Sequence, residues 1–223
     1  MQTFKFSELT ADSLNSIVAL QDQGVVPEMW SKFNVSLTSQ ERRQVKTVSS
    51  SLLDHRVVLM NEATIWSRAI YPLLVLAEQD RLVAWAQVPL KAQYPSFGLE
   101  GIADGVVGRN MSGVTKSYYL IMVEAKRGLE AQDPQIQLYG AMLAAARLNW
   151  EQNRQVPQEI FGCYTIADNW TFMHGLISEI EADRPAMTVA SSREYAEKIE
   201  AEAIFRILKS ITGKYAQKMA EAA

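Results

Sequence analysis

Residues Tyr118-Tyr119-Leu120-Ile121-Met122-Val123-Glu124-Ala125-Lys126 are apolar until two charges appear at the end of the run. A strand of this composition is typically buried on both faces of a sheet, so helices must cover it. Side chains alternate along a strand, which places Glu124 and Lys126 on one face, about 6.6 Å apart along the chain. Charges at the end of a buried strand need partners nearby. The run therefore predicts a central strand that ends in a polar site.

The segments around this strand predict an antiparallel meander followed by a helix. Pro95 and Gly98 separate two earlier strand candidates, and the turn-forming run 108–113 leads into the third strand. Asp133-Pro134 suits an N-cap followed by a first helical position. The predicted order is strands 82–91, 99–107 and 117–126, a helix over 135–152, and strands 159–166 and 171–180. This order is typical of a mixed sheet flanked by helices.

Helical patterns predominate at the two ends of the chain. Residues 1–55 predict an N-terminal helical layer, and residues 192–220 predict a C-terminal helix. Another helix precedes the first strand, and Pro72 should kink it or end it early. The expected N-caps are Thr10, Thr38 or Ser39, and Asn61. We therefore expect one α/β domain over residues 1–223, with residues 60–180 as its core.

Composition narrows the class of protein. Of the 223 residues, 48% are hydrophobic and 21% charged, which is the balance of a globular chain. The longest apolar stretch, Tyr71–Ala77, is less than half of the roughly 20 residues that cross a bilayer. Without a signal pattern at the N-terminus, we expect a cytoplasmic protein that does not enter membranes. Cys163 is the single cysteine, so any metal site must use oxygen ligands.

The charge balance limits how the chain can bind nucleic acid. The formal net charge is −3, whereas proteins that coat nucleic acid usually carry a strong basic excess. Contact with a nucleic acid must therefore be local.

Asp104 provides a second carboxylate near Glu124. It lies in Gly101-Ile102-Ala103-Asp104-Gly105, and a meander brings this strand alongside the strand of Glu124. Two carboxylates about 4 Å apart repel by about 4 kcal/mol at an effective dielectric constant near 20, so one is protonated or a cation bridges them. Mg²⁺ binds one or two carboxylates together with waters and phosphate oxygens. Lys126 would then orient a water or neutralise charge on a phosphate.

Asp104 followed by Glu124-x-Lys126 and an amphipathic helix resembles the PD-(D/E)XK nuclease superfamily, which has the restriction-endonuclease-like fold. The resemblance covers residues 60–180. It implies an α-β-β-β-α-β core and hydrolysis of phosphodiester bonds in nucleic acid, with DNA favoured. It also implies Mg²⁺ or Mn²⁺ held by Asp104 and Glu124, with Lys126 assisting the attacking water. Ala103 stands where many members have the proline of the motif.

The same resemblance suggests further site residues. Glu62, on the helix before the sheet, matches an acidic residue that many members place near the metal. A glutamine on the helix after the lysine strand is also expected, and this chain offers Gln135 and Gln137. Gln135 forms a Gln-x-x-x-Tyr pattern with Tyr139. Gln137 shares a face of small residues that lets a helix lie close to a sheet, and it is favoured for the site.

Other interpretations of these residues stay open. Glu124 and Lys126 could form a structural ion pair without function. The chain could then be a non-catalytic binding or assembly module that keeps the nuclease fold, and self-association as a homodimer is also open. His55 and His174 lack a nucleophile motif around them, which argues against a catalytic triad. Cys163 is expected to be a core thiol.

Overall fold

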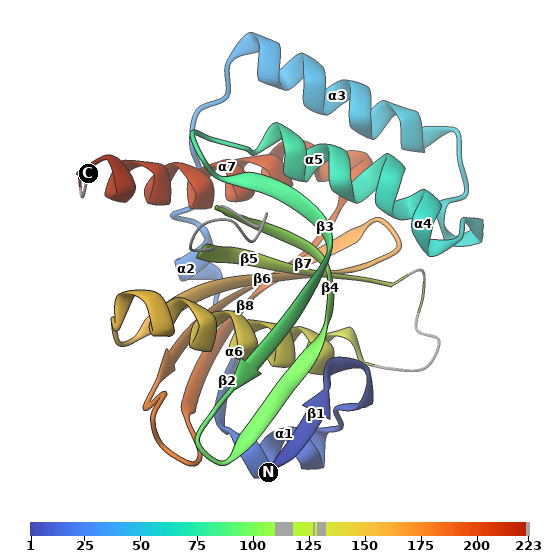
Figure 1. Ribbon diagram of the computed structural model, residues 1–223. Coiled ribbons are helices and arrows are strands. Elements are labelled where there is room, and N and C mark those ends of the chain that lie inside the picture. The colour runs from blue at the N-terminus through green and yellow to red at the C-terminus, as the bar shows by residue number, and fades with distance from the viewer. Residues whose placement is uncertain (110–117, 127, 129–132, 222–223) are drawn as a thin grey trace.

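An eight-stranded mixed sheet lies between two layers of helices in the computed structural model (Figure 1). Residues 1–109, 118–126, 128 and 133–221 are described; the predictions for residues 110–113 and Ser117 lie outside them. Helices α3, α4, α5 and α7 lie on one side of the sheet and α1 and α6 on the other. The predicted class, an α/β protein with a mixed sheet flanked by helices, is confirmed.

The strands run in the order β1-β4-β5-β6-β7-β8-β2, with β3 paired to β4. Their bounds are β1 Gln2–Lys5, β2 Ala19–Val25, β3 Val83–Gln93, β4 Phe97–Arg109, β5 Tyr118–Lys126, β6 Gln158–Ile166, β7 Asn169–Ser178 and β8 Ala186–Ala196. The helices are α1 Ala11–Ile17, α2 Pro27–Trp30, α3 Ser39–Leu53, α4 Glu62–Ile65, α5 Tyr71–Leu76, α6 Pro134–Asn153 and α7 Glu197–Glu221.

The predicted meander is present. Strands β3, β4 and β5 pair antiparallel in chain order, and α6 then crosses over to β6, which pairs parallel with β5. A parallel neighbour requires such a crossover, because a tight turn cannot join parallel strands. Burial on both faces of β5 follows from this arrangement, and its residues from Tyr119 to Ala125 are buried.

Side-chain caps fix where the helices start. Thr10 and Thr38 each form a capping box, with Ser13 and Glu41 respectively. The Asn61 side chain accepts a hydrogen bond from the Thr64 amide, and the Asp133 side chain accepts one from the Gln135 amide. Each cap satisfies a backbone donor that has no partner within its helix. The caps predicted at Thr10, Thr38, Asn61 and Asp133 are therefore confirmed, with Thr38 chosen over Ser39.

The helix before β3 widens where proline interrupts it. Residues Trp66–Ile70 form a π-helical turn between α4 and α5, and Pro72 follows in the first turn of α5. Proline has no N–H and crowds the carbonyl one turn earlier, so the chain relieves the conflict by widening that turn. The predicted disturbance at Pro72 is therefore present, and the helical path continues to Leu76.

The prediction of purely helical ends is wrong. Residues 1–55 also contribute two strands, of which β1 pairs parallel with β4 and β2 pairs parallel with β8. Near the C-terminus, strand β8 extends to Ala196, so α7 begins at Glu197 and not at residue 192. Strands β1 and β2 are mostly exposed, so they carry little apolar alternation. Their conformation depends on distant partner strands, which local periodicity does not reveal.

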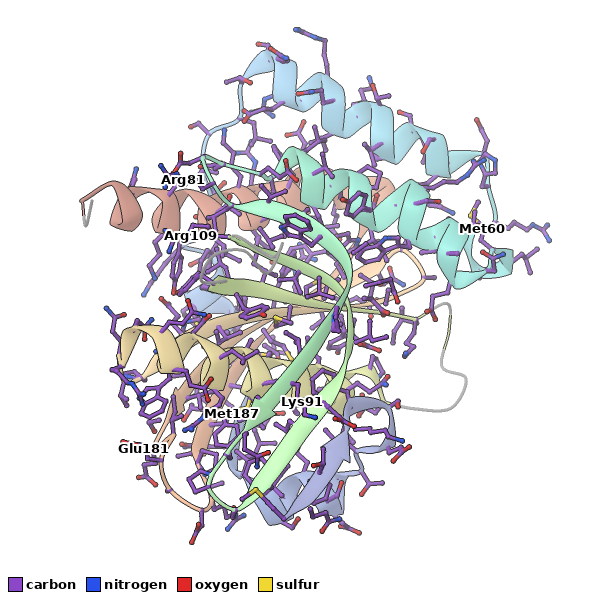
Figure 2. All side chains as sticks on the ribbon, in the orientation of Figure 1. Met60, Arg81, Lys91, Arg109, Glu181 and Met187 are labelled. Carbon is purple, nitrogen blue, oxygen red and sulfur yellow. The ribbon has the colours of Figure 1, made fainter. Side chains whose placement is uncertain are left out.

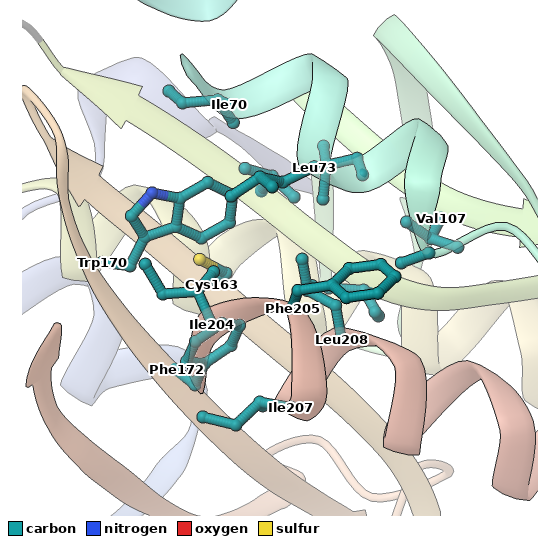
Figure 3. Close-up of a cluster of buried hydrophobic side chains, with 14 of the residues drawn as sticks. Ile70, Leu73, Val107, Cys163, Trp170, Phe172, Ile204, Phe205, Ile207 and Leu208 are labelled. Carbon is teal, nitrogen blue, oxygen red and sulfur yellow. The ribbon is translucent and has the colours of Figure 1, made fainter. Parts of the chain in front are cut away.

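Each face of the sheet has its own hydrophobic cluster. The cluster under α3, α5 and α7 includes Trp170, Cys163 and Phe205, which Figure 3 shows packed together. The cluster around α6 and α1 includes Met142 and Leu138. Cys163 is fully buried, as expected for a core thiol. Among the described helices, none is both long and apolar enough to span a membrane.

Strands β3 and β4 pass from one cluster to the other. On β3, Ala84 packs in the α5 cluster and Val88 in the α6 cluster. Their partners on β4 divide in the same way, since Val107 pairs with Ala84 and Ala103 pairs with Val88. Between these two pairs lies Gln87, which has a left-handed backbone with φ of 53°. Along β3 and β4, packing therefore passes from the α5 cluster to the α6 cluster at the position of Gln87.

Glu197, the first residue of α7, is a buried acid in the core. Its Oε2 accepts a hydrogen bond from Trp170 Nε1 at 2.8 Å, and its Oε1 is buried with no hydrogen-bond partner among the described residues. Burial, opposed by the Trp170 hydrogen bond and aided by the charge of Asp168, raises the pKa of Glu197 from 4.5 to about 8. Glu197 is therefore protonated in the folded chain at neutral pH.

We predict that Glu197 makes stability fall with rising pH. Between pH 4.5 and about 8 the folded chain keeps a proton that the unfolded chain has released, so the free energy of unfolding decreases across this window. Replacing Glu197 by Gln should flatten the decrease in urea unfolding measured from pH 4.5 to 8. Glu194→Gln, an exposed change on β8, is the control. An unchanged pH slope in Glu197→Gln would contradict the prediction.

Candidate functional site

The end of β5 carries an ion pair that is largely shielded from solvent. Lys126 Nζ lies 2.8 Å from Glu124 Oε1, and the two side chains are 26% and 8% exposed. Because side chains alternate along β5, both residues project to one side of the strand. The structure therefore brings together the two charges with which the apolar run ends.

Asp104 lies at a fork in the sheet. One edge of β4 pairs with β1 through Phe97–Glu100 and with β5 through Gly105–Arg109. Asp104 falls between these two pairings, immediately before β4 meets β5. Its Oδ2 accepts a hydrogen bond from the Ala125 amide at 2.8 Å. The carboxylate thus takes the place of a backbone acceptor where the strands part.

Gln87 holds the other oxygen of the same carboxylate. Gln87 Nε2 donates to Asp104 Oδ1 at 3.2 Å from the neighbouring strand β3. The left-handed backbone of Gln87 is uncommon for a residue with a side chain and costs roughly 1–3 kcal/mol. Strained conformations of this kind concentrate at functional sites, which singles out the contact between Gln87 and Asp104.

Glu62 adds a third carboxylate from the helical side. It is the first residue of α4, where a negative charge suits the helix dipole. Burial raises the pKa of Glu62, and the charge of Asp104 raises it further, while Lys126 lowers it. Glu62 and Asp104 also line one cavity, so the acid predicted on this helix does reach the strand site.

The site has more negative than positive charge. Burial raises the pKa of Glu124 to about 7, and Asp104 and Glu62 add to the shift although Lys126 opposes it. Burial alone would lower the pKa of Lys126, but its contact with Glu124 and the other two carboxylates raise it. Among the described residues, one ammonium therefore faces three carboxyl groups and does not balance them.

A cavity of about 260 Å³ opens beside Glu62 and Asp104, and its described lining does not include Glu124 or Lys126. It is lined by Glu62, Ala63, Trp66, Gln87, Asp104 and Ala125. Trp66 lies one helical turn after Glu62, so both side chains share a face, a signal that the sequence contains. The role of Gln87 depends on its left-handed backbone and on pairing with β4, and no local pattern reveals it. Trp66 and Gln87 were absent from the sequence prediction.

The two glutamines of α6 lie away from the lining of this cavity. Gln137 is buried and lines a larger depression of about 530 Å³ with Gly101 and Ile102 on β4. Lys91, labelled in Figure 2, lies at the same depression. Gln135 donates to Asp22 Oδ2 of β2 at 3.1 Å and also contacts Tyr139. A part for either glutamine in the chemistry stays a prediction.

The donor set suits a hard cation. Its carboxylate oxygens are the ligands that Mg²⁺ and Mn²⁺ prefer, and a divalent ion would offset the excess negative charge. Among the described residues, no three His, Cys, Asp or Glu side chains are already arranged around a common metal position. Mg²⁺ needs only one or two carboxylates when waters and phosphate oxygens complete its shell. Asp104 and Glu124 supply two carboxylates whose charges interact, and Glu62 lines the cavity together with Asp104.

A scan against models of known protein families finds no match for this chain, and a search of curated proteins finds none either. The interpretation of the site therefore depends on its own geometry and charge.

We predict that the pKa of Glu124 depends on its acidic neighbours. Asp104→Asn should lower it from about 7, because the charge of Asp104 raises it more than that of Glu62 does. Glu62→Gln should lower it by a smaller amount. The measurement is titration of the Glu124 carboxyl carbon by NMR, with Glu100→Gln as a control on β4. A Glu124 pKa that stays near 7 in Asp104→Asn would show that the two groups do not interact.

Proposed function

We propose that this chain is a metal-dependent nuclease that hydrolyses phosphodiester bonds in DNA, with a restriction-endonuclease-like fold of the PD-(D/E)XK type. The observation that carries the proposal is the meeting of Glu124, Lys126 and Asp104 at the fork between β4 and β5. Along the chain, the elements follow in the order α4–α5, the meander β3–β5, α6 and the parallel strand β6. This order supports the fold assignment.

The carboxylates would hold the metal. Asp104 and Glu124 would be the ligands, and Glu62 would add charge at the edge of the site. Bound Mg²⁺ would polarise the phosphate and supply an activated water. Holding Asp104 by the Ala125 amide and by Gln87 keeps its carboxylate oriented before the ion arrives. Because Glu124 has a pKa of about 7, protons compete with the metal below neutral pH.

Lys126 would act on the phosphate and the attacking water. Its side chain is 26% exposed and remains paired with Glu124. Its raised pKa keeps it protonated, and it therefore donates hydrogen bonds and does not accept the proton of the water. A fixed positive charge beside the phosphate stabilises the negative charge that builds up in the transition state.

A non-catalytic module with the same fold is the second candidate. The contact of Lys126 with Glu124 favours it, because an ion pair can be structural without any chemistry. The net charge of −3 also favours it, since a nucleic-acid enzyme usually offers more basic surface.

We predict that the purified chain cleaves DNA in the presence of Mg²⁺ or Mn²⁺. Lys126→Ala and Asp104→Asn should each reduce the rate about 10²–10³-fold, the usual effect of removing one group that stabilises the transition state. Lys32→Ala, an exposed change after α2, should leave the rate unchanged. The assay uses linear, circular, single-stranded and branched DNA, followed by gel electrophoresis. All substrates remaining intact with both metals would favour the non-catalytic module.

A further inference from the structure

The cavity beside the carboxylates has an aromatic wall that metal binding does not need. Trp66 forms this wall, and its indole is partly buried against the core cluster of α5. Tyr71 packs against it with ring centroids 5.7 Å apart. On β4, Gly105 leaves room for the ring, because a Cβ at that position would lie 2.4 Å from Trp66 Cη2. The indole is therefore held in place next to Asp104.

Small side chains keep the space in front of the indole open. Ala63 on α4 and Ala125 on β5 line the cavity. The volume of about 260 Å³ is below the roughly 300–1,000 Å³ of pockets for drug-sized ligands. It suits one planar ring system more than an extended molecule. Gln87, an exposed residue also in the lining, donates from Nε2 to Asp104, and its amide oxygen can accept a hydrogen bond from the edge of such a ring.

We infer that this cavity binds one unpaired base of a DNA strand, stacked on Trp66, next to the phosphate to be cleaved. The inference rests on the proposed function and adds to it the class of substrate: single-stranded DNA or an unpaired strand end. A base inside a duplex would have to leave its stack to enter the cavity, at a cost in free energy.

The charge around the cavity supports a base contact over a backbone contact. Among its described lining residues, two are acids and none is a cation. Proteins that bind duplex DNA gain much of their affinity from Lys and Arg on phosphates, and this chain has a net charge of −3. Stacking on an aromatic ring needs no such charge and accepts any base. Affinity should therefore come mainly from Trp66.

The test measures binding separately from cleavage. A fluorescein-labelled single strand and a hairpin duplex of the same sequence are titrated with the full chain, with Ca²⁺ replacing Mg²⁺ to suppress hydrolysis. The single strand should bind about tenfold tighter or more, because the duplex must first release a base. Trp66→Leu should weaken binding of the single strand about 5- to 150-fold, whereas Trp66→Phe keeps most of the affinity.

A cavity-filling variant covers the case in which Trp66→Leu fails to fold. Ala63→Leu adds bulk to the exposed side of α4 inside the cavity and should also block binding of the single strand. Ser67→Leu adds a similar apolar group on the next turn, outside the cavity lining, and should bind normally. Melting temperatures of both variants check the fold.

The outcomes separate this inference from the nuclease proposal. Equal binding of duplex and single strand, or normal binding by a folded Ala63→Leu, overturns the base site even if the chain cleaves DNA. Single-strand binding that depends on Trp66 and Ala63 supports the base site even if no metal-dependent cleavage occurs.

Discussion

The hydrogen bond from the Ala125 amide to Asp104 holds the site at the fork of the sheet. Strand β4 leaves β1 at Glu100 and joins β5 at Gly105, so the edge between these pairings would lack backbone partners from a neighbouring strand. A carboxylate at position 104 supplies an acceptor there and remains accessible from the cavity. The same interaction therefore ties two strands together and presents an acidic group beside Glu124.

Charge imbalance is the consequence of this arrangement. Glu124 is buried next to Asp104, with Lys126 as its ion-pair partner. Burial is the main reason that the pKa of Glu124 rises to about 7, and the charge of Asp104 adds to the shift although Lys126 opposes it. Keeping these groups close together lowers the stability of the folded chain. Such costs are common at sites where charge has a function.

The central part of the fold could be predicted from the sequence because its signals are local. The apolar run ending in Glu124 and Lys126, the turn residues and the Asp133-Pro134 cap each mark an element without knowledge of its neighbours. Strands β1 and β2 could not be found in this way, since each is short and mostly exposed and pairs parallel with a distant strand. Strand β8 was also missed, because it ends at Ala196 and α7 begins at the next residue, with no turn between them to mark a boundary.

The residues of the candidate site also fall into those that local sequence signals predict and those that they do not. Alternation along β5 predicted the shared face of Glu124 and Lys126, and the meander predicted the approach of Asp104. Gln87 could not be predicted, because its contribution depends on a left-handed backbone that appears only when β3 and β4 pair. Gln137 illustrates the reverse case: its stripe of small residues packs at Gly140 against Phe6 and Leu9, and the Gln137 side chain lines a different depression.

The most direct test of the account is calorimetric titration of the chain with Mn²⁺ at pH 7 in buffers of different ionisation enthalpy. If Asp104 and Glu124 bind one ion, one Mn²⁺ should bind per chain. Because the pKa of Glu124 is about 7, about half of the Glu124 carboxyl groups carry a proton at pH 7, so binding should release about half a proton. Glu124→Gln should abolish the proton release and weaken binding. Absence of Mn²⁺ binding, or binding without proton release that Glu124→Gln leaves unchanged, would contradict the account.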